Sequence, residues 1–345
     1  MTVPRTVHQE VYDADPDAVV TQSPAWSDAL AARGHRDASR LHTLPDGRRL
    51  VLPLVGRTGL SEESWPYAWG YGGAIVEGGE LTVADARYVL ADLRRRPALL
   101  RSVVPMPLRG AVWAEAAGAD ATRVPYTAQV VDLAPGWDEL WARGFRRQAR
   151  NSVRKAERFE LDVRRETGAD PDPRGLDVFR TLYAQSVDRW AADRGQPLPL
   201  ARALAARRDR PGQVAAAARA LGERCVVWSV LRDGAPVAAN VVLHEPGTRH
   251  ALGWMCAMDT TGIARETLAT YLLHSLAIQD ACAAGARWFH MGESDAGSGP
   301  EHFKRYFGAV AVPYAALRFE RLPFSRAEQA ARSALGAVSR WRRAS

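Results

Sequence analysis

The spacing of apolar residues is easiest to interpret in the second half of the chain. Apolar runs of strand length there are separated by Asp233-Gly234 and Pro246-Gly247, two typical turn sequences. A longer stretch with helical spacing ends at Gly285, a common stop residue for helices. The predicted elements, in order, are strands at 225–232, 236–244 and 249–256, a loop at 257–263, a helix at 264–284, a strand at 288–291, a glycine-rich loop at 292–299, a helix at 300–306 and a strand at 314–319.

The first half shows weaker patterns of the same kinds. Ser23-Pro24 is a helix start signal, and Pro45-Asp46-Gly47 lies between two strand-like runs. Residues 44–50 resemble residues 231–237, and both segments sit between strand-like runs, as an internal duplication would leave them. The predicted elements are a helix at 25–33, a hairpin at 39–55, a helix at 81–95, a strand at 126–133 and a helix at 137–158.

Length and composition narrow the class of protein. A chain of 345 residues exceeds the usual size of one compact core, so we expect two domains. The chain contains no apolar run long enough to span a bilayer and no signal peptide pattern, so we expect a cytoplasmic protein with no membrane partner. Cys225, Cys256 and Cys282 are too far apart for a disulfide framework or a zinc site.

The net charge of +7 is carried almost entirely by arginine, and Lys155 and Lys304 are the only lysines. A basic surface permits a polyanionic partner such as a phosphorylated cofactor or tRNA, without choosing between them. The two lysines stand out because arginine has replaced lysine nearly everywhere else.

The order of elements in the second half resembles the core of the GNAT acyltransferases. Three motifs are similar to the Fem-type branch of that superfamily, the aminoacyl-tRNA-dependent peptidyltransferases and their relatives. They are the arginine-rich segment 145–156 (FRRQARNSVRKA), the FKRYFG segment 303–308 and the aromatic, glycine-rich loop 65–73. The FKRYFG segment is the most specific of the three, and the resemblance extends over nearly the whole chain.

This resemblance implies an α+β fold with mixed sheets, built as two GNAT-like domains in tandem. We expect an N-terminal domain at residues 1–128, a C-terminal catalytic domain at 129–320 and a helical tail at 321–345 that returns to the first domain.

One departure from the superfamily concerns the donor. GNAT enzymes that use acetyl-CoA carry a glycine-rich loop before the long helix, where backbone N–H groups hold the pyrophosphate. The corresponding segment here, 260–267, contains one glycine and places the negative charge of Glu266 there. Fem-type proteins also lack this loop, so the resemblance implies aminoacyl-tRNA as co-substrate and no tightly bound cofactor. Acyl-CoA remains the alternative donor.

The arginine-rich segment is expected to bind the donor. At about 100° per residue, the apolar side chains of 145–156 gather on one arc and the arginines on the opposite arc. Guanidinium groups bind phosphates bidentately, which fits tRNA; the alternative is a solvated helix face. The candidate donor-binding residues are Arg146, Arg147, Arg150, Arg154 and Arg158, with Lys155 on the flank of the apolar stripe.

Lys304 is the strongest catalytic candidate. Acyl transfer to an amine passes through a tetrahedral oxyanion, which a fixed cation stabilises. In Fem-type enzymes the lysine of this motif is thought to act at that point or on the donor's terminal phosphate. Phe303 would anchor the helix that carries it. The alternative for Lys304 is an ordinary surface lysine.

A base is needed only to remove one proton, because the donor is already activated. Glu293 and Asp259 lie just after predicted strands, although capping or loop solvation is the more common role of such acids. Neither a Ser-His-Asp arrangement nor a P-loop nor a metal-ligand cluster is found, so direct attack on the donor is expected.

The acceptor is expected in the cleft between the domains, where small-molecule sites often form. The aromatic loop would line this cleft, or it would be a packed aromatic corner instead. The candidate residues are Trp65, Tyr67, Trp69 and Tyr71, together with Arg189 and Trp190 at the end of a predicted helix.

The sequence therefore favours an enzyme that transfers an aminoacyl group from aminoacyl-tRNA to a small-molecule amine, in bacterial specialised metabolism. A peptidoglycan-bridge peptidyltransferase is disfavoured, because residues 200–221 are too short for the helical arm often found in that group. The competing hypotheses are an acyl-CoA-dependent N-acyltransferase and an inactive RNA-binding module. The amino acid, the acceptor and the oligomeric state are left open.

Overall fold

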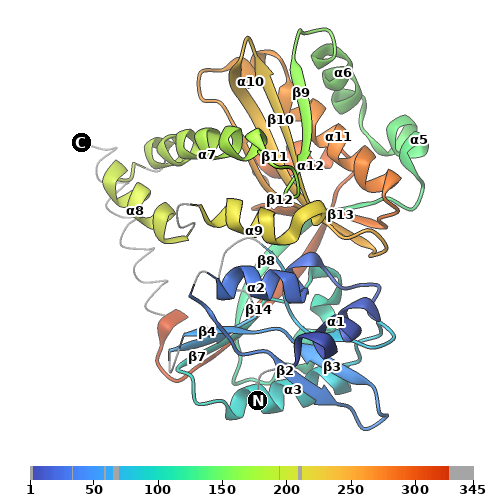
Figure 1. Ribbon diagram of the computed structural model, residues 1–345, viewed down its shortest axis with the longest axis vertical. Coiled ribbons are helices and arrows are strands. Elements are labelled where there is room, and N and C mark those ends of the chain that lie inside the picture. Colours follow the sequence, from blue (N-terminus) through green and yellow to red (C-terminus); the bar gives the residue numbers. More distant parts are fainter. Residues whose placement is uncertain are drawn as a thin grey trace.

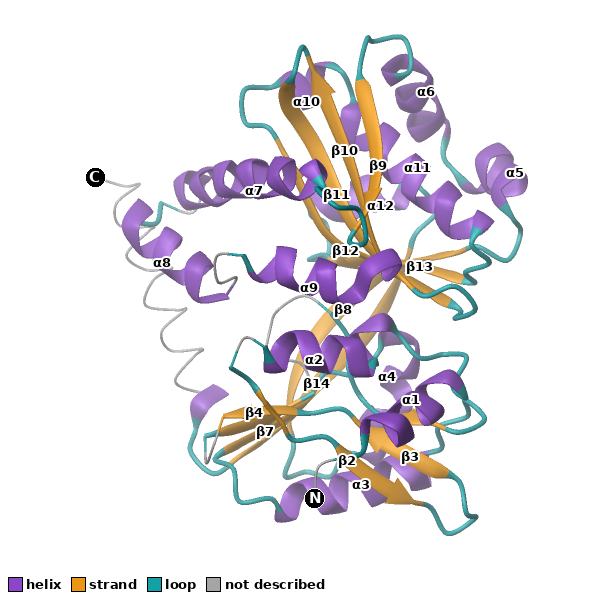
Figure 2. Cartoon of the chain, in the orientation of Figure 1, coloured by secondary structure: helices purple, strands orange, loops and turns teal. Residues whose placement is uncertain are grey.

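A computed structural model describes residues 3–32, 34–57, 60–64, 70–193, 195–208 and 212–325. The described strands form one eleven-stranded mixed sheet and a separate three-stranded sheet. Helices cover the large sheet on both faces in the second half, and the small sheet packs with the first-half helices (Figures 1 and 2). The predicted α+β class with mixed sheets is confirmed.

The first half contains four α-helices and, apart from β8, short strands within the described residues. In chain order they are α1 (Arg5–Asp13), α2 (Pro24–Ala31), β1 (Arg36–Asp37), β2 (Arg40–Thr43), β3 (Arg49–Leu52), β4 (Val55–Arg57), β5 (Ser61–Glu63), β6 (Ile75–Val76), α3 (Val83–Arg95), β7 (Leu100–Val103), α4 (Gly110–Ala116) and β8 (Thr122–Asp132).

The second half contains longer strands and longer helices. They are α5 (Trp137–Glu139), a π-helical turn (Leu140–Gly144), α6 (Arg147–Ala156), β9 (Asp162–Thr167), α7 (Arg174–Asp193), α8 (Leu198–Arg208), α9 (Gln213–Leu221), β10 (Cys225–Arg232), β11 (Ala235–His244), β12 (His250–Met258), α10 (Ile263–Glu266), α11 (Ala269–Ala283), β13 (Trp288–Glu293), α12 (Gly299–Arg305) and β14 (Val310–Glu320).

Strands β8 and β14 join the two halves into one sheet, whose order is β1-β4-β5-β7-β14-β8-β13-β12-β11-β10-β9. Their antiparallel ladder extends from the pair Val310–Val130 to the pair Arg318–Thr122. Pro125 and Pro313 lie where the two strands pair only with each other, because β13 reaches β8 from residue 128 onward and β7 reaches β14 from residue 317 onward. A proline lacks a backbone donor, so this one-sided stretch tolerates it.

The two faces of the second-half sheet bury different helices. On one face, α7 and α9 cover apolar residues of β10, β11 and β12, including Val227, Val241 and Met255. On the other face, α11 covers Phe289 and Val242 together with the start of the α6 region. Helix α9 also packs on α2 of the first half, so this face is shared between the halves.

Two predicted helices are interrupted in the structure. The helix expected at 137–158 breaks at Phe145 and Arg146, which have extended backbone angles, and ends at Ala156, so Arg158 follows the helix. The helix expected at 264–284 breaks at Leu268, whose φ of 58° is rare for a branched residue. The spacing of apolar residues over a long window does not reveal a break of one or two residues.

The expected domain boundary at residues 128 and 129 falls inside β8, and it stays a prediction. Of the helical tail expected at 321–345, residues 326–345 lie outside the described residues, so its return to the first domain stays a prediction. Within the described ranges, none of the helices is long and apolar enough to cross a membrane.

Candidate active site

Lys304 lies on α12. This helix begins directly after the glycine-rich loop that follows β13. Ser298 accepts a hydrogen bond from the Glu301 backbone at 3.3 Å and so caps the start of the helix. The Lys304 Nζ donates to the backbone oxygens of Gly292 at 3.2 Å and Glu293 at 2.9 Å. Burial lowers the pKa of Lys304 to about 8, against the opposing effect of the Glu293 carboxylate. The structure therefore holds a partly desolvated ammonium at the end of a buried strand.

Two phenylalanines fix the helix that carries this lysine. Phe303 contacts the rings of Tyr271 and His274 at centroid distances of 4.9 and 5.0 Å. Phe307 is fully buried and packs edge-on against Phe145 at 5.1 Å. The predicted anchoring by Phe303 is thus seen, and the arginine-rich segment and the FKRYFG segment pack against each other through their aromatic residues.

A glycine allows this close approach. Gly308 has a φ of +80°, and a Cβ there would lie 3.0 Å from the Gly144 carbonyl oxygen. The Arg146 N–H donates to the Tyr306 oxygen at 2.8 Å across the same contact. The final glycine of the segment is therefore required both by the turn and by the neighbouring backbone.

Beside Lys304, the parallel strands β12 and β13 are hydrogen-bonded over a short stretch. Their paired residues are 250–252 and 288–290, although β12 continues to Met258 and β13 to Glu293. Cys256 is exposed on the unpaired part of β12, and its thiol is an electrostatic neighbour of Lys304. The strands thus separate next to the lysine.

Glu293 contacts Tyr314, which belongs to a small cluster of tyrosines. Its carboxylate accepts a hydrogen bond from the Tyr314 hydroxyl at 2.7 Å. The Tyr71 ring lies 6.0 Å from that of Tyr314, and Tyr126 stacks on Tyr314 at 5.6 Å. Burial and the nearby Glu293 carboxylate raise the pKa of Tyr71. The structure therefore brings together the predicted base candidate and one predicted cleft residue.

Tyr126 and Tyr314 were not predicted as site residues. They are cross-strand partners in the β8–β14 ladder, so their proximity depends on a pairing of segments far apart in the sequence. Tyr71 is buried, and it belongs to a packed aromatic corner rather than to an open cleft. The candidate residues Trp65, Tyr67 and Trp69 of the same loop lie outside the described residues.

The arginine-rich helix presents several cations to solvent. Arg147, Arg154 and Lys155 on α6 are exposed, as are Arg146 before it and Arg158 after it. In the described part of the chain, none of these five forms an ion pair. Arg154 lies over the Trp141 ring at 5.8 Å.

Arg150 differs from its neighbours. Its Nη1 donates to the backbone oxygens of Ala142 at 2.7 Å and Phe145 at 2.5 Å. These bonds satisfy carbonyls at the end of the π-helical turn, so Arg150 contributes to local structure as well as to the positive face. Its predicted role in donor binding is therefore less direct than that of Arg147 or Arg154.

Asp259 occupies the loop that precedes α10. Its carboxylate accepts from the backbone N–H groups of Gly262 at 2.9 Å, Ile263 at 3.1 Å and Ala264 at 2.7 Å, and from the Thr261 hydroxyl. Burial alone would raise the pKa of Asp259, but these hydrogen bonds outweigh it and lower the pKa. The contacts support the capping alternative for this residue.

This capping role leads to a prediction for Asp259→Asn. Because the neutral amide is a weaker acceptor for three N–H groups, we expect a loss of about 1–3 kcal/mol in the free energy of unfolding, measured in urea. Turnover per folded molecule should stay within a few-fold of the original. A fall of more than about 100-fold, typical for a general base, would restore Asp259 to the catalytic residues.

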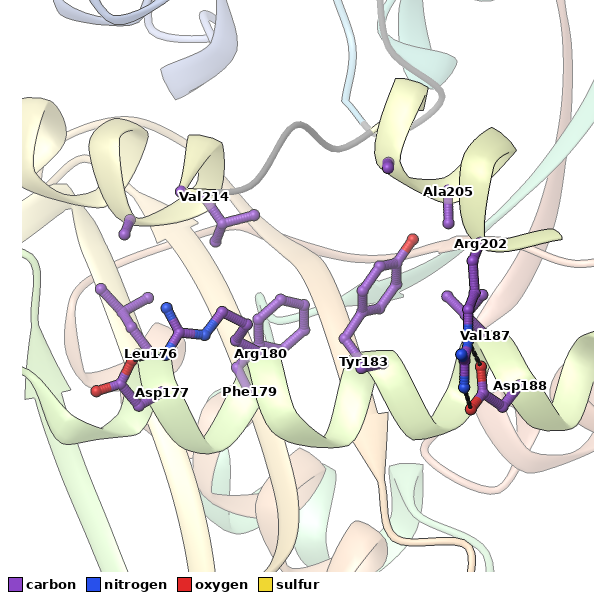
Figure 3. Close-up of a pocket in the computed structure, with 14 residues that line it drawn as sticks. Leu176, Asp177, Phe179, Arg180, Tyr183, Val187, Asp188, Arg202, Ala205 and Val214 are labelled. Atoms are coloured by element: carbon purple, nitrogen blue, oxygen red, sulfur yellow. Dashed lines mark hydrogen bonds and ion pairs between the residues drawn. The ribbon is translucent and has the colours of Figure 1, made fainter. Parts of the chain in front are cut away.

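A groove with a volume of about 360 Å³ lies between α7, α8 and α9 (Figure 3). Leu176, Phe179 and Tyr183 line it, and the Asp188–Arg202 ion pair closes one end. Lys304 belongs to the other face of the sheet, so the groove is not the lysine site. Trp190 contacts Tyr183 edge-on at 6.0 Å, and the roles of Trp190 and Arg189 in acceptor binding stay predictions.

Across the described residues, His, Cys, Asp and Glu side chains form no cluster of three that could hold a metal ion.

Comparison with known proteins places this geometry in context. Residues 143–305 match the family of acetyltransferase (GNAT) domains. No curated protein matches the sequence. A crystal structure of FemX superposes with a TM-score of 0.53 at 12% identity, over 93% of this chain and 96% of that one.

Two further structures give similar values. The C-terminal domain of a putative lysylphosphatidylglycerol synthetase from Agrobacterium fabrum has a TM-score of 0.52 at 12% identity, over 97% of this chain and 96% of that one. A conserved protein of unknown function from Bacteroides thetaiotaomicron has 0.52 at 11%, over 92% and 97%. At such identities the similarity establishes the fold, and it does so over nearly the whole chain.

Proposed function

We propose, on the premise that this chain is a Fem-like member of the GNAT superfamily with two GNAT-like domains in tandem, that it transfers an aminoacyl group from aminoacyl-tRNA to an amine. The observation that carries the acyl-transfer reaction is the partly desolvated Lys304 ammonium, fixed by two backbone oxygens where β12 and β13 separate.

The reaction can be written with these residues. The acceptor nitrogen attacks the ester carbonyl carbon of the donor, and the resulting oxyanion is stabilised by the Lys304 ammonium. The Glu293 carboxylate takes the proton that the nitrogen loses. The intermediate then collapses, the carbon–oxygen bond to the ribose breaks, and the ribose oxygen leaves as a hydroxyl with the proton that Glu293 returns. The products are one amide and one free tRNA.

Two observations favour tRNA over coenzyme A as the donor. The backbone N–H groups before α10, where a pyrophosphate would bind in a coenzyme A site, already donate to Asp259. The exposed cations of the α6 region, none of them in an ion pair within the described ranges, begin where Phe145 packs on Phe307 of the Lys304 segment. A phosphate backbone bound along α6 would therefore lead toward the lysine.

The acceptor is proposed to be a small-molecule amine whose nitrogen lies beside Glu293, within specialised metabolism in the bacterial cytoplasm. Helices α8 and α9 are short, and this supports a small acceptor rather than a peptidoglycan-bridge precursor.

A direct assay distinguishes the donors. The protein is incubated with bulk tRNA charged with radiolabelled amino acids, or with acetyl-CoA, and a panel of amines. We expect label to move from tRNA to an amine, and RNase treatment of the tRNA to abolish the transfer. Acceptor-dependent thiol release from acetyl-CoA alone would instead establish the coenzyme A alternative, and tight tRNA binding without transfer would establish an RNA-binding protein.

The arginine face gives a second prediction. Arg147→Glu and Arg154→Glu should each weaken binding of charged tRNA, because each removes a cation that contacts phosphate. Each should also reduce the slope of log affinity against log salt by about 0.7–0.9. Arg87→Glu, at an exposed position on α3, is the matched control. Equal affinities and equal slopes for all three variants would remove the α6 face from the donor site.

A further inference from the structure

The hydroxyl of Tyr314 donates a hydrogen bond of 2.7 Å to the Oε1 of Glu293, the proposed base. Tyr314 lies on β14 and is buried, and Glu293 is the last residue of β13. Strand β8 lies between these two strands in the sheet. The Tyr314 side chain therefore reaches across β8 to the carboxylate, and the reaction written above gives this contact no role.

Glu293 is held at its backbone as well as at its side chain. Its backbone oxygen accepts from the Lys304 Nζ at 2.9 Å and from the Ser294 hydroxyl at 2.8 Å. The Ser294 N–H donates to the Thr127 oxygen at 3.1 Å, which ties the start of the loop to β8. One residue thus connects the ammonium proposed for the oxyanion with the carboxylate proposed for the proton. The bond from Tyr314 fixes the carboxylate, the part of Glu293 that the backbone contacts leave free to rotate.

Neighbouring rings hold Tyr314 itself in place. Tyr126 is its cross-strand partner in the β8–β14 ladder and stacks on it at a centroid distance of 5.6 Å. Tyr71, from the first half of the chain, meets it edge-on at 6.0 Å. A rotation of the Tyr314 ring would break both contacts, so its hydroxyl stays directed at Glu293.

A glycine of the first half allows a third contact with this tyrosine. Gly110 begins α4, and a Cβ built on it would lie 2.6 Å from the Tyr314 Cβ and 3.4 Å from the Tyr314 Cα. No side chain fits at 2.6 Å from another carbon, so the start of α4 packs directly on Tyr314 because residue 110 is glycine. The position of a second-half side chain thus depends on a first-half helix.

The charges around the carboxylate keep this hydrogen bond in one direction. Burial and the Glu293 carboxylate raise the pKa of Tyr314, so its hydroxyl remains a donor at neutral pH. The other titratable side chains that Glu293 influences are Tyr71, whose pKa is also raised, and Lys304, whose positive charge favours an ionised carboxylate. A donor bonded to the charged form of an acid favours that form. Tyr314 therefore favours ionised Glu293, the form that accepts a proton.

We propose that Tyr314 is a positioning residue for acyl transfer, whose hydroxyl holds the Oε1 of Glu293 so that the Oε2 faces the acceptor nitrogen. This proposal rests on the proposed function. Because Tyr314 binds the Oε1, the Oε2 is the atom that takes the proton lost by the nitrogen. The same atom returns this proton to the ribose oxygen, and Tyr314 keeps its own proton throughout.

The first test needs no turnover. The full chain is labelled with carbon-13 at the tyrosine ring carbon that bears the hydroxyl, and the Tyr314 signal is identified by its loss in Tyr314→Phe. This signal should move as pH is lowered and Glu293 takes up a proton. In Glu293→Gln the movement should be absent, because the acceptor no longer titrates. A Tyr314 signal with the same pH course in both proteins would overturn the proposal, whether or not the protein transfers acyl groups.

The kinetic test uses the charged tRNA and amine that support transfer by the unmodified protein. Tyr314→Phe keeps the ring and loses the hydroxyl, and it should lower kcat about tenfold, less than the roughly 10²–10⁴-fold of a group that transfers the proton itself. KM for the amine should stay nearly unchanged, because the lost bond is not made to the substrate. The acid limb of the pH–rate profile should move to higher pH by about one to two units, as expected for losing a hydrogen bond to a charged group.

Gly110→Ala tests the same geometry from a residue that touches no reacting group. Its methyl group should displace Tyr314, so the acid limb should move in the same direction as in Tyr314→Phe. The double variant should show no further movement, because both changes act through one hydrogen bond. Movements that add fully in the double variant would count against the proposed positioning.

Tyr12→Phe is the matched control, since Tyr12 on α1 is also buried and its pKa is raised by burial and by a nearby carboxylate, that of Glu245. It should leave kcat and the acid limb unchanged. Equal kinetic effects in Tyr12→Phe and Tyr314→Phe, or a lower kcat in Tyr314→Phe with the acid limb unmoved, would show that Tyr314 is structural only. Absence of any transfer by the unmodified protein would count against the proposed function instead, and the ring-carbon titration would still test the contact.

Discussion

Lys304→Met is expected to lower turnover by about 10²–10³-fold while the protein stays folded. The substitution keeps the length of the side chain but removes the ammonium, and the loss of one oxyanion donor costs about 2.7–4 kcal/mol in a transition state. The measurement is single-turnover transfer of label from charged tRNA to the amine, with urea unfolding as the control for the fold. Turnover near that of the original protein would remove Lys304 from the catalytic residues.

The depressed pKa of this lysine adds a pH dependence that a structural role does not predict. Because the pKa of Lys304 is about 8, the charged form is lost as pH rises through 8, and turnover should fall on that side. Lys304→Arg should lack this alkaline fall, since a guanidinium stays charged there. An alkaline fall that persists in Lys304→Arg would assign it to another group.

Stability should change in the opposite direction over the same range. The unfolded chain keeps an ordinary lysine pKa of 10.5, while the folded chain has a pKa of about 8. Between these values the unfolded state binds more protons, so the free energy of unfolding rises with pH. The rise belongs to Lys304 and should be absent in Lys304→Met.

Phe307→Ala is expected to cost about 3–5 kcal/mol of stability, the usual loss for truncating a fully buried aromatic residue. The Phe307 side chain is 0% exposed and packs against Phe145, Tyr271 and Phe303, so its removal leaves a cavity between α11, α12 and the segment before α6. The measurement is the midpoint and slope of urea unfolding.

The same truncation at an exposed phenylalanine is the control. Phe324 is 38% exposed, and Phe324→Ala should stay within about 0.5 kcal/mol of the original protein. Equal effects at the two positions would contradict the core role of Phe307. With the results for Lys304, this pair of variants separates the chemical and structural parts of the FKRYFG segment.

Much of the second half was predictable because its elements are local. Strands β10, β11 and β12 follow one another through short turns, and residues 225–232 were predicted with the bounds that the structure gives β10. The small strands β1, β4, β5 and β7 were missed, because strands of two to four residues contain too little alternation to detect.

The residues of the candidate site were also predictable only where they depend on local sequence. Lys304 and Phe303 were predicted because one continuous segment carries them both. The capping role of Asp259, by contrast, depends on a loop conformation in which three backbone N–H groups donate to its carboxylate. Arg150 was predicted on the arginine face, yet its partners are carbonyls exposed by a helix break that periodicity does not show.

The sequence by itself determined the order of the second-half elements, the segments that resemble the Fem-type branch, and the position of the candidate catalytic lysine. Each of these depends on residues close together in the chain. Only the tertiary structure decided that Tyr71, Tyr314 and Glu293 meet, and that Gly110 of the first half packs against Tyr314. Those contacts depend on strand register and on the packing of one half against the other, which local propensities do not specify.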